Sequence, residues 1–434
     1  MPGRRGLSGL AAVLLAPVLL LVGGALVTDG GPDDAAPAQV ATQAGAPRGS
    51  VEALQDRLRR LPRDDAAWAA LGVAYLGEAR RTADPSFYDL AGDALDRSLA
   101  VRPEGNADAL AGQAALANAR HDFAAGRDLA LRAVAVDAYD ATARGVLFDA
   151  QLELGEYEAG TATLDAMLSL RPGVPSFTRA SYLFELRGDT AEATSALERA
   201  LDVATTPPDA SFALLHLGEL ALGAGDVETA AAHFAEGLRR DPARVDLLVG
   251  QARAAVARGD VDAALADYAD VVERLPQPSY LYEYGELLES LGRDADADEQ
   301  YAVAEAAQAL FTAAGAVPDV ETVLADADHG RADRALTTAQ AQYATRRSVQ
   351  VEDALAWALH AAGRSAEALP HALAAQRLGT RNALWDYHRG IIQLAAGQVE
   401  AGRASLALAL ETNPHFSVRH APLAEQALAA SAAG

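Results

Sequence analysis

Cysteine is absent from the 434-residue sequence, and only 6% of the residues are aromatic. Without cysteine the chain has no thiol nucleophile, zinc–thiolate site, iron–sulfur cluster or disulfide framework. Alanine supplies much of the 50% of residues that are hydrophobic. Because alanine favours helices, whereas aromatic and β-branched residues favour strands, we expect helices throughout.

Positive charge is also scarce, with 36 basic against 60 acidic residues and a net charge of −24. Such a negative field repels the phosphates of nucleic acids and of anionic lipid headgroups. Nucleic acid is therefore not expected as a partner. The charge is compatible with cationic partners or metal ions, and equally with a role in solubility alone.

Catalytic motifs are missing as well. The sequence contains no glycine-rich phosphate loop, no Gly-x-Ser-x-Gly nucleophile elbow and no His-Glu-x-x-His zinc helix. We therefore expect no catalytic residues, no enzymatic activity and no cofactor.

The N-terminus has the pattern of an export signal. Arg4 and Arg5 are followed by no charged residue before Asp29, and Leu10–Val27 is an almost wholly apolar run of 18 residues. Basic residues before such a run keep the start in the cytoplasm and direct the rest across the membrane. Residues 1–27 are thus predicted to be a signal peptide or a signal anchor, and this length suits both.

The export signal predicts an extracytoplasmic protein that is either secreted or anchored to the cell membrane by this segment. Contact with a membrane is expected only through it. Residues 28–50 are rich in alanine, proline, glycine and aspartate and have no periodicity. They cannot bury enough apolar surface to offset their ordering entropy, which predicts a disordered linker.

A repeat of about 34 residues runs through the rest of the chain. Its mark is a glycine followed by a polar residue, spaced by 33 to 38 residues, at Gly155, Gly188, Gly225, Gly259, Gly292, Gly330, Gly363 and Gly397. A glycine in the left-handed conformation ends a helix, and a following aspartate such as Asp189, Asp226 or Asp260 caps the next helix. Each unit is therefore predicted to be a helical hairpin.

Several units depart from this pattern. The first has extra residues around Arg80 to Tyr88, and in the second His121 stands where the other units have glycine. Histidine tolerates the left-handed conformation better than most residues. No proline ends the helix after Tyr301, so Ala302–Ala314 is expected to lengthen it. The segment from Asp319 to Arg347 fits the repeat least well.

The first unit reads Trp68-x-x-Leu71-Gly72-x-x-Tyr75, and in this it resembles the tetratricopeptide repeat family. The resemblance implies an all-α superhelix, or solenoid, of about ten helical hairpins over residues 51–434. A final capping helix is expected near Ser417–Ser431, because open solenoids need a polar end. The resemblance further implies a non-enzymatic scaffold for protein–protein interactions.

In that family the first helices of the hairpins line a concave groove that holds peptide ligands. The resemblance places eight residues of this chain in the groove: Tyr182, Glu185, Glu219, Tyr282, Glu286, Glu289, Trp357 and His360. Aromatic and acidic side chains together suit a peptide or protein segment that carries basic residues. Arg253 is the one clear cation among the groove positions. Packing between helices is the alternative role for these residues, notably for Trp357.

Six of the nine histidines lie in the last quarter of the chain: His329, His360, His371, His388, His415 and His420. Asp326 and Asp328 precede His329, so a metal-handling accessory protein is an alternative function. No two of these histidines have the three- or four-residue spacing that places two ligands on one helix face, and no metal ligand is assigned. A third reading is architectural, with repeats that stack on copies of the chain.

Overall fold

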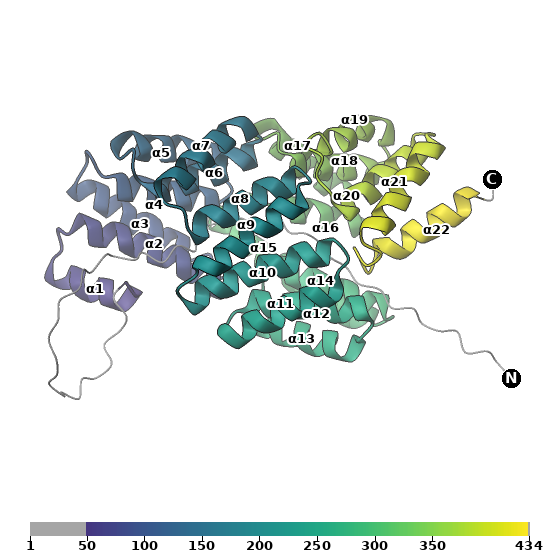
Figure 1. The fold of residues 1–434 in the computed structure, drawn as a ribbon, viewed down its shortest axis with the longest axis horizontal. Coiled ribbons are helices and arrows are strands. Elements are labelled where there is room, and N and C mark those ends of the chain that lie inside the picture. Colours follow the sequence, from purple (N-terminus) through teal and green to yellow (C-terminus); the bar gives the residue numbers. More distant parts are fainter. Residues whose placement is uncertain (1–48, 433–434) are drawn as a thin grey trace.

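The computed structural model describes residues 49–432, which form 22 α-helices and no β-strand (Figure 1). The predicted signal segment, residues 1–27, and nearly all of the predicted linker lie outside the described residues. None of the described helices is both long enough and apolar enough to cross a membrane. The helices are α1 (Val51–Arg60), α2 (Asp65–Thr82), α3 (Phe87–Val101), α4 (Ala107–Ala119), α5 (Phe123–Val136), α6 (Ala141–Leu154), α7 (Tyr157–Leu170), α8 (Val174–Leu186), α9 (Thr190–Val203), α10 (Pro207–Gly223), α11 (Val227–Arg240), α12 (Val245–Arg258), α13 (Val261–Arg274), α14 (Pro278–Ser290), α15 (Asp294–Ala313), α16 (Val320–Asp328), α17 (Ala332–Thr345), α18 (Val349–Ala361), α19 (Ser365–Ala375), α20 (Ala383–Ala395), α21 (Val399–Thr412) and α22 (His420–Ala432).

The helices pair into ten consecutive antiparallel hairpins, which we number from hairpin 1 (α2/α3) to hairpin 10 (α20/α21). The helix α1 precedes the first hairpin, and α22 follows the last and packs on α20 and α21. We call the turn inside a hairpin its intra-hairpin turn, and the segment that leads to the next hairpin a connection. The predicted all-α solenoid of about ten hairpins is confirmed.

The intra-hairpin turns have the predicted backbone. All eight predicted glycines are left-handed, with φ between +71° and +81°. His121 is left-handed too, with φ of +60°. Asp226 and Asp260 accept the backbone N–H groups of Thr229 and Ala263 at the start of the second helix. Asp189 occupies the same position, but its side chain accepts no backbone N–H from the described residues.

Small residues allow the helices within a hairpin, and those of neighbouring hairpins, to approach closely. The ring of Phe234, on the second helix of hairpin 5, is fully buried against Gly218 and Gly250. A Cβ atom at these glycines would lie 2.3 and 2.5 Å from the ring. Real Cβ atoms do not approach so closely, so alanine at either position would push the helices apart.

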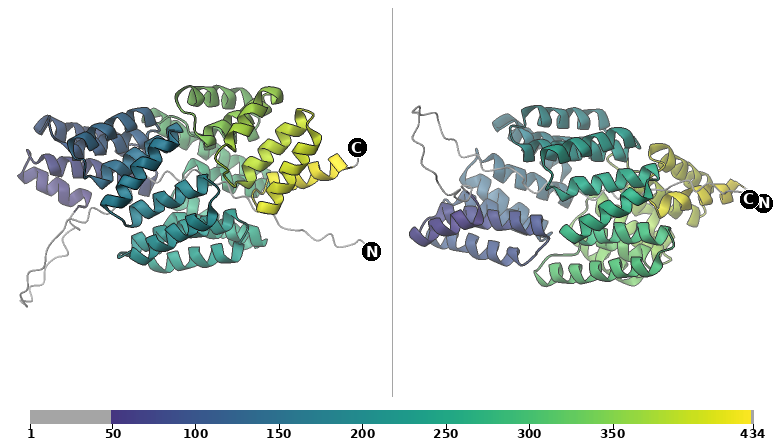
Figure 2. Two further views of the ribbon diagram at one scale, coloured as in Figure 1. Left: turned by 45° about the horizontal axis from the view of Figure 1, so that its top comes forward. Right: turned by 90° about the horizontal axis from the view of Figure 1, so that it is seen from below.

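The hairpins wind into a superhelix whose successive turns touch (Figures 1 and 2). Each contact joins the intra-hairpin turn of one hairpin to the connection five hairpins later. The carbonyls of Arg120, Leu154, Leu186 and Leu222 accept hydrogen bonds from the Val317 N–H, the Arg347 N–H, the Thr380 hydroxyl and the Asn413 amide, respectively. These residue pairs are 191 to 197 positions apart, so about five and a half hairpins complete one superhelical turn.

A long helix closes the first superhelical turn. The helix α15 has 20 residues, as the missing proline predicted. Its last turn reaches hairpin 1, where the Phe311 ring lies 6.4 Å from the Tyr88 ring. Phe311 thereby joins the apolar core formed by α1, α2 and α3. This closure surrounds the inside of the first turn with helices.

Candidate functional site

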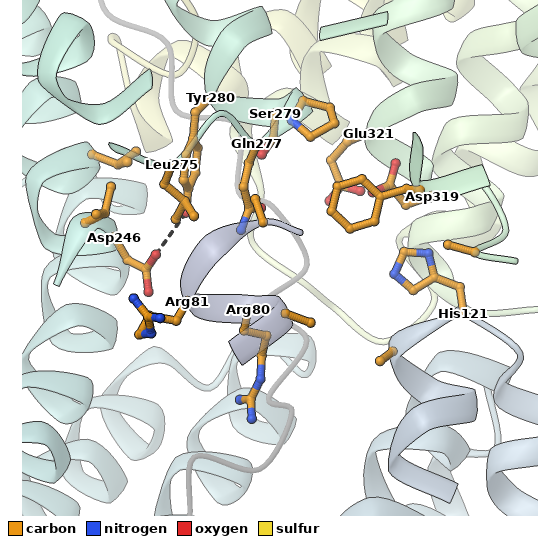
Figure 3. Close-up of a pocket in the computed structure, with 18 of the residues that line it drawn as sticks. Arg80, Arg81, His121, Asp246, Leu275, Gln277, Ser279, Tyr280, Asp319 and Glu321 are labelled. Carbon is orange, nitrogen blue, oxygen red and sulfur yellow. Dashed lines mark hydrogen bonds between the residues drawn. The ribbon is translucent and has the colours of Figure 1, made fainter. Parts of the chain in front are cut away.

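A cavity of about 770 Å³ lies inside the first superhelical turn (Figure 3). Its walls come from the end of α2, from α10, α12 and α14, and from the connection between α15 and α16. These segments are far apart in the sequence and meet only because the superhelix closes on itself. The cavity therefore belongs to the tertiary structure and not to any single repeat.

The end of α2 brings basic side chains into the cavity. The extra residues of the first unit lengthen this helix to 18 residues and carry Arg80 and Arg81 inward (Figure 3). Burial lowers the pKa of the Arg80 guanidinium. Arg81 forms an ion pair with Glu78 one turn earlier on the same helix.

The start of α16 supplies an acidic wall. Asp319 caps this helix and accepts the backbone N–H of Thr322 at 2.9 Å. Glu321, two residues later, has no cationic group of the described residues within 4 Å. Burial, and then the negative charges of Asp319 and Glu153, raise the pKa of the Glu321 carboxyl well above its usual value. The site thus favours the neutral form of Glu321 unless a cation is supplied.

Across the cavity from Glu321, other charged groups already have partners. The Tyr280 hydroxyl donates to Asp246 at 3.1 Å (Figure 3). The Arg244 guanidinium lies 3.4 Å from the same carboxylate and 5.1 Å from the centre of the Phe212 ring. Glu321 is therefore a lining carboxylate whose desolvation no ion pair within the described residues offsets.

Arg253 lies in the wall of the cavity with its guanidinium bound to a carboxylate of the chain. It is 6% exposed, and its guanidinium donates twice to Glu283, at 2.9 and 2.6 Å. The Tyr268 hydroxyl donates to the same carboxylate at 3.0 Å. Arg253 is one of five arginines that line the cavity, together with Arg80, Arg81, Arg244 and Arg346.

Two of the eight predicted groove residues, Glu219 and Tyr282, line the cavity. Glu219 accepts a hydrogen bond from His216 at 2.7 Å. The Tyr282 side chain is largely buried, and its hydroxyl accepts from Arg331 at 3.2 Å. Both side chains present part of their surface to the cavity while they contact neighbouring residues.

Tyr182 and Glu185, on α8, lie where the two superhelical turns meet. The Tyr182 hydroxyl accepts a hydrogen bond from the Gln350 amide at 2.6 Å, across the turns. Burial, together with the negative charge of Glu219, raises the pKa of the Glu185 carboxyl to about 7.

Glu286 and Glu289, on α14, contact residues of the chain's own C-terminal part. Glu286 is buried with an oxygen 3.5 Å from His329 Nε2. Glu289 accepts hydrogen bonds from the Tyr301 hydroxyl and from Arg419, both at 3.0 Å. Both carboxylates thus contact side chains of later hairpins or connections, and Glu289 links α14 to the segment before α22.

Trp357 and His360 lie in an aromatic cluster between the last hairpins. The Trp357 indole N–H donates to Asp328 at 2.7 Å, and its ring stacks on the His388 ring at 4.2 Å. His360 contacts the Ser365 hydroxyl at 3.0 Å.

Each of two C-terminal histidines contacts a single carboxylate. His388 donates to Asp353 at 2.9 Å, and His420 donates to Asp328 at 3.2 Å. Within residues 49–432 no group of three or more histidine, aspartate and glutamate side chains is arranged to hold a metal ion.

The sequence signals missed the cavity residues that have the most distinctive surroundings, Arg80, Arg81, Asp319 and Glu321. Both pairs lie at irregular units, namely the lengthened first hairpin and the poorly matching segment that starts at Asp319. Departures from the repeat were therefore the available signal, because insertions in repeat proteins map to one face and often to the binding face.

Comparisons with known proteins agree with this architecture. A family model described as the tetratricopeptide repeat matches residues 177–245 and 249–321. A comparison with curated proteins gives no match.

Solved structures with similar folds include three from different organisms. A thermophilic tetratricopeptide repeat protein from Thermus thermophilus is 23% identical over 44% of this chain and 98% of its own, with a TM-score of 0.39. A tetratricopeptide repeat protein from Parabacteroides merdae is 18% identical over 60% of this chain and 98% of its own, with a TM-score of 0.33. The human IFIT1 dimer is 15% identical over 76% and 77%, with a TM-score of 0.45. From the family match, the ten hairpins and their left-handed turns, we conclude that the chain is a tetratricopeptide repeat protein.

Proposed function

We propose that the protein is a non-enzymatic scaffold that holds a basic segment of another protein in the cavity of its first superhelical turn. Tetratricopeptide repeats generally serve protein–protein interaction. In this proposal a lysine or arginine side chain of the partner pairs with Glu321, and the neighbouring side chains contact the partner's backbone.

The surroundings of Glu321 carry the proposal. Its side chain is half-buried beside Asp319 and has no cationic group of the described residues within 4 Å. Ionising such a group costs free energy, and a cation brought to it recovers that cost. A basic partner is therefore bound more tightly than a neutral one of the same shape.

The size and the field of the site agree with a peptide ligand. The volume of about 770 Å³ lies within the range of roughly 300–1,000 Å³ that is usual for ligand pockets. The net charge of −24 attracts a cationic segment over a distance and raises its rate of association. Glu286 and Glu289 are not part of the proposed contact, because their carboxylates already bind residues of the chain.

We further propose that the protein works outside the cytoplasm. The basic start and the apolar run of residues 1–27 support export. Fractionation of cells that produce the full chain, compared with a chain in which Arg4 and Arg5 are aspartate and Leu14 and Leu15 are arginine, tests this proposal. Full-length protein that stays in the cytoplasm would rule it out.

Chemical coupling tests the cavity directly, because the chain contains no lysine. A library of eight-residue peptides with one lysine each is incubated with the protein and a carbodiimide, which joins amines to carboxylates. Peptide lysines then react with the chain, and mass spectrometry locates the bond. We expect coupling at Glu321 and Asp319, and loss of peptide affinity by about tenfold in Glu321→Gln.

The matched control is Glu400→Gln, since Glu400 is an exposed carboxylate at the far end of the chain. It should leave both the coupling pattern and the affinity unchanged. Coupling spread evenly over surface carboxylates, with equal affinity in Glu321→Gln, would contradict the proposed site.

A further inference from the structure

The superhelix has two kinds of edge, and they already pair within the chain. The intra-hairpin turns of hairpins 2 to 5 form one edge, and the connections after hairpins 7 to 10 form the other. The four contacts between them follow one rule, by which an intra-hairpin turn meets the connection five hairpins later. The interface is thus a repeating one that each further hairpin could extend.

The glycines of the turns show where this pairing stops. A Cβ atom at Gly155 or Gly188 would lie 2.6 or 2.2 Å from a carbonyl oxygen of the next superhelical turn. A Cβ atom added at the equivalent glycines of hairpins 7 to 10 would have no heavy atom from elsewhere in the described residues within 4 Å. These glycines are Gly292, Gly330, Gly363 and Gly397. The intra-hairpin turns of the second superhelical turn are therefore free at these glycines, while Glu289 and Asp328, near the turns of hairpins 7 and 8, contact Arg419 of the same chain.

The first superhelical turn has the complementary free edge, made of connections. Its connections expose large apolar side chains. Of the paired connections, those after hairpins 8 and 10 bury Ser348 and Asn413, and the one after hairpin 7 exposes Val317. Tyr139 is 81% exposed, and the exposed fractions of the apolar residues at the ends of α1, α5, α7 and α9 lie between 37% and 54%: Leu61, Val136, Leu170 and Val203. Apolar residues repeated at one position of successive hairpins mark a contact surface.

We infer that a second copy of the chain docks here, with the free intra-hairpin turns of one copy on the free connections of the next. The occupant is a second copy because both edges of the new contact are of the kinds that already pair inside the chain. The contact continues the superhelix from one molecule into the next.

The first and last described helices set the register. The helix α22 packs on α20 and α21, and α1 packs on α2. Placed next to each other, α22 of one copy and α1 of the next fill the position of an eleventh hairpin. Each intra-hairpin turn meets the connection five hairpins later, and the shared eleventh hairpin is counted between the copies. Hairpins 7 to 10 of one copy then face the connections after hairpins 1 to 4 of the next.

The charges at the edges are mixed. Inside the chain, acidic residues in the turns (Asp122, Glu156, Asp189, Asp226) face connections of which those after hairpins 8 and 9 carry two arginines each (Arg346, Arg347, Arg377, Arg381), whereas the one after hairpin 7 carries none. On the free edges, arginine in the turns of hairpins 7, 8 and 9 (Arg293, Arg331, Arg364) faces Arg102 and Glu104, then Asp137 and Asp140, then Arg171 in the proposed register. The three turn arginines also pair with carboxylates of their own hairpins. Apolar burial, and not charge, is therefore the main attraction in the proposed contact.

Such a contact joins two different surfaces and does not close on itself. Contacts of this kind add copies without limit and produce a filament with the axis of the superhelix. The inference does not depend on the proposed cavity ligand, because neither edge contains Glu321.

Site-specific crosslinking tests the contact, since the chain has no cysteine of its own. The register places Gln398, in the turn of hairpin 10, against Thr205, in the connection after hairpin 4. Full-length Gln398→Cys and Thr205→Cys variants are mixed and treated with a short bismaleimide. We expect the mixed dimer to form at least tenfold faster than either homodimer. Asp165→Cys, on the exposed face of α7, is the control partner for Gln398→Cys and should give no such excess.

Sedimentation of the full chain supplies a second, independent readout. We expect species of two, three and more copies that grow with concentration, and at least a fivefold weaker association in Tyr139→Asp. Val303→Asp, at an exposed apolar residue of α15 away from both edges, should associate like the unaltered chain. Equal rates for mixed and like pairs, or a single copy up to about 100 µM, would overturn the inference.

Discussion

Arg346 and Glu153 are 193 residues apart in the sequence, yet the guanidinium of one donates to the carboxylate of the other at 3.1 Å. Both side chains are only 7% exposed. This buried ion pair joins the second superhelical turn to the first and forms part of the wall of the cavity. The shape of the cavity therefore depends on contacts between turns as well as on the repeats.

Replacing Arg346 by alanine should destabilise the protein by about 3–5 kcal/mol, because Glu153 then keeps a buried charge without a partner. Urea unfolding of Arg346→Ala measures the loss. The double variant Arg346→Met/Glu153→Leu should recover most of it, since no charge is left buried. Arg132→Ala, at an exposed arginine, is the control and should change stability by less than about 0.5 kcal/mol. Equal stability of Arg346→Ala and the control would contradict the role of this pair.

Gly218→Ala should destabilise hairpin 5 by about 1–3 kcal/mol, because the new methyl group overlaps the buried Phe234 ring. Gly92→Ala is the matched control on α3, where a Cβ atom would meet only one side-chain atom, at 3.5 Å. Alanine at position 92 should raise the free energy of unfolding by about 0.5–1 kcal/mol, because it lowers the entropy of the unfolded chain. Thermal unfolding of both variants should give shifts of opposite sign. A stabilising Gly218→Ala would show that the two helices can move apart freely.

Acid should weaken the contact between α22 and α16. Burial raises the pKa of Asp328, but the charge of His420 and its hydrogen bond outweigh this effect and lower the pKa to about 2. A carboxyl with a lowered pKa adds stability above its ordinary pKa of 3.8 and loses that contribution as the pH falls towards 2.

Between pH 4 and pH 2 the free energy of unfolding should fall by about 2 kcal/mol more in the unaltered protein than in Asp328→Asn. Denaturant titrations at several pH values measure this difference. Parallel pH profiles for the two proteins would exclude an ion pair between Asp328 and His420.

Glu185 should have the opposite effect on stability. Its pKa is raised to about 7, so the unfolded chain loses this proton at a lower pH than the folded one. Stability then falls as the pH rises from about 4.5 to 7, and Glu185→Gln removes this fall. The variant should be more stable than the unaltered protein at pH 8 and equal to it at pH 4. A Glu185→Gln protein that is less stable at pH 8 would mean that the carboxylate has a favourable partner.

The repeats were predictable because their signals are local. A glycine at the end of one helix and a polar residue at the start of the next act within a few residues, and His121 could replace glycine for the same local reason. The long α15 likewise followed from the absence of a proline. The number of hairpins followed from the period.

The candidate site was less predictable because it depends on residues far apart in the sequence. Register alone places Glu289 in a concave groove, but Arg419, 130 residues later, takes up its carboxylate. Gln350 contacts Tyr182 over 168 residues in the same way. The pitch of the superhelix decides such contacts, and small angles added over many hairpins decide the pitch. No single repeat carries that information.

The central claim is that Glu321 receives the positive charge of a bound protein segment. Titration calorimetry of the protein with the lysine peptide that couples to Glu321, at pH 6 in two buffers of different ionisation enthalpy, measures the protons released on binding. The account predicts release of up to about one proton by the unaltered protein and none by Glu321→Gln, because the incoming cation lowers a raised carboxyl pKa. Binding with no proton release, or the same release from both proteins, would contradict it.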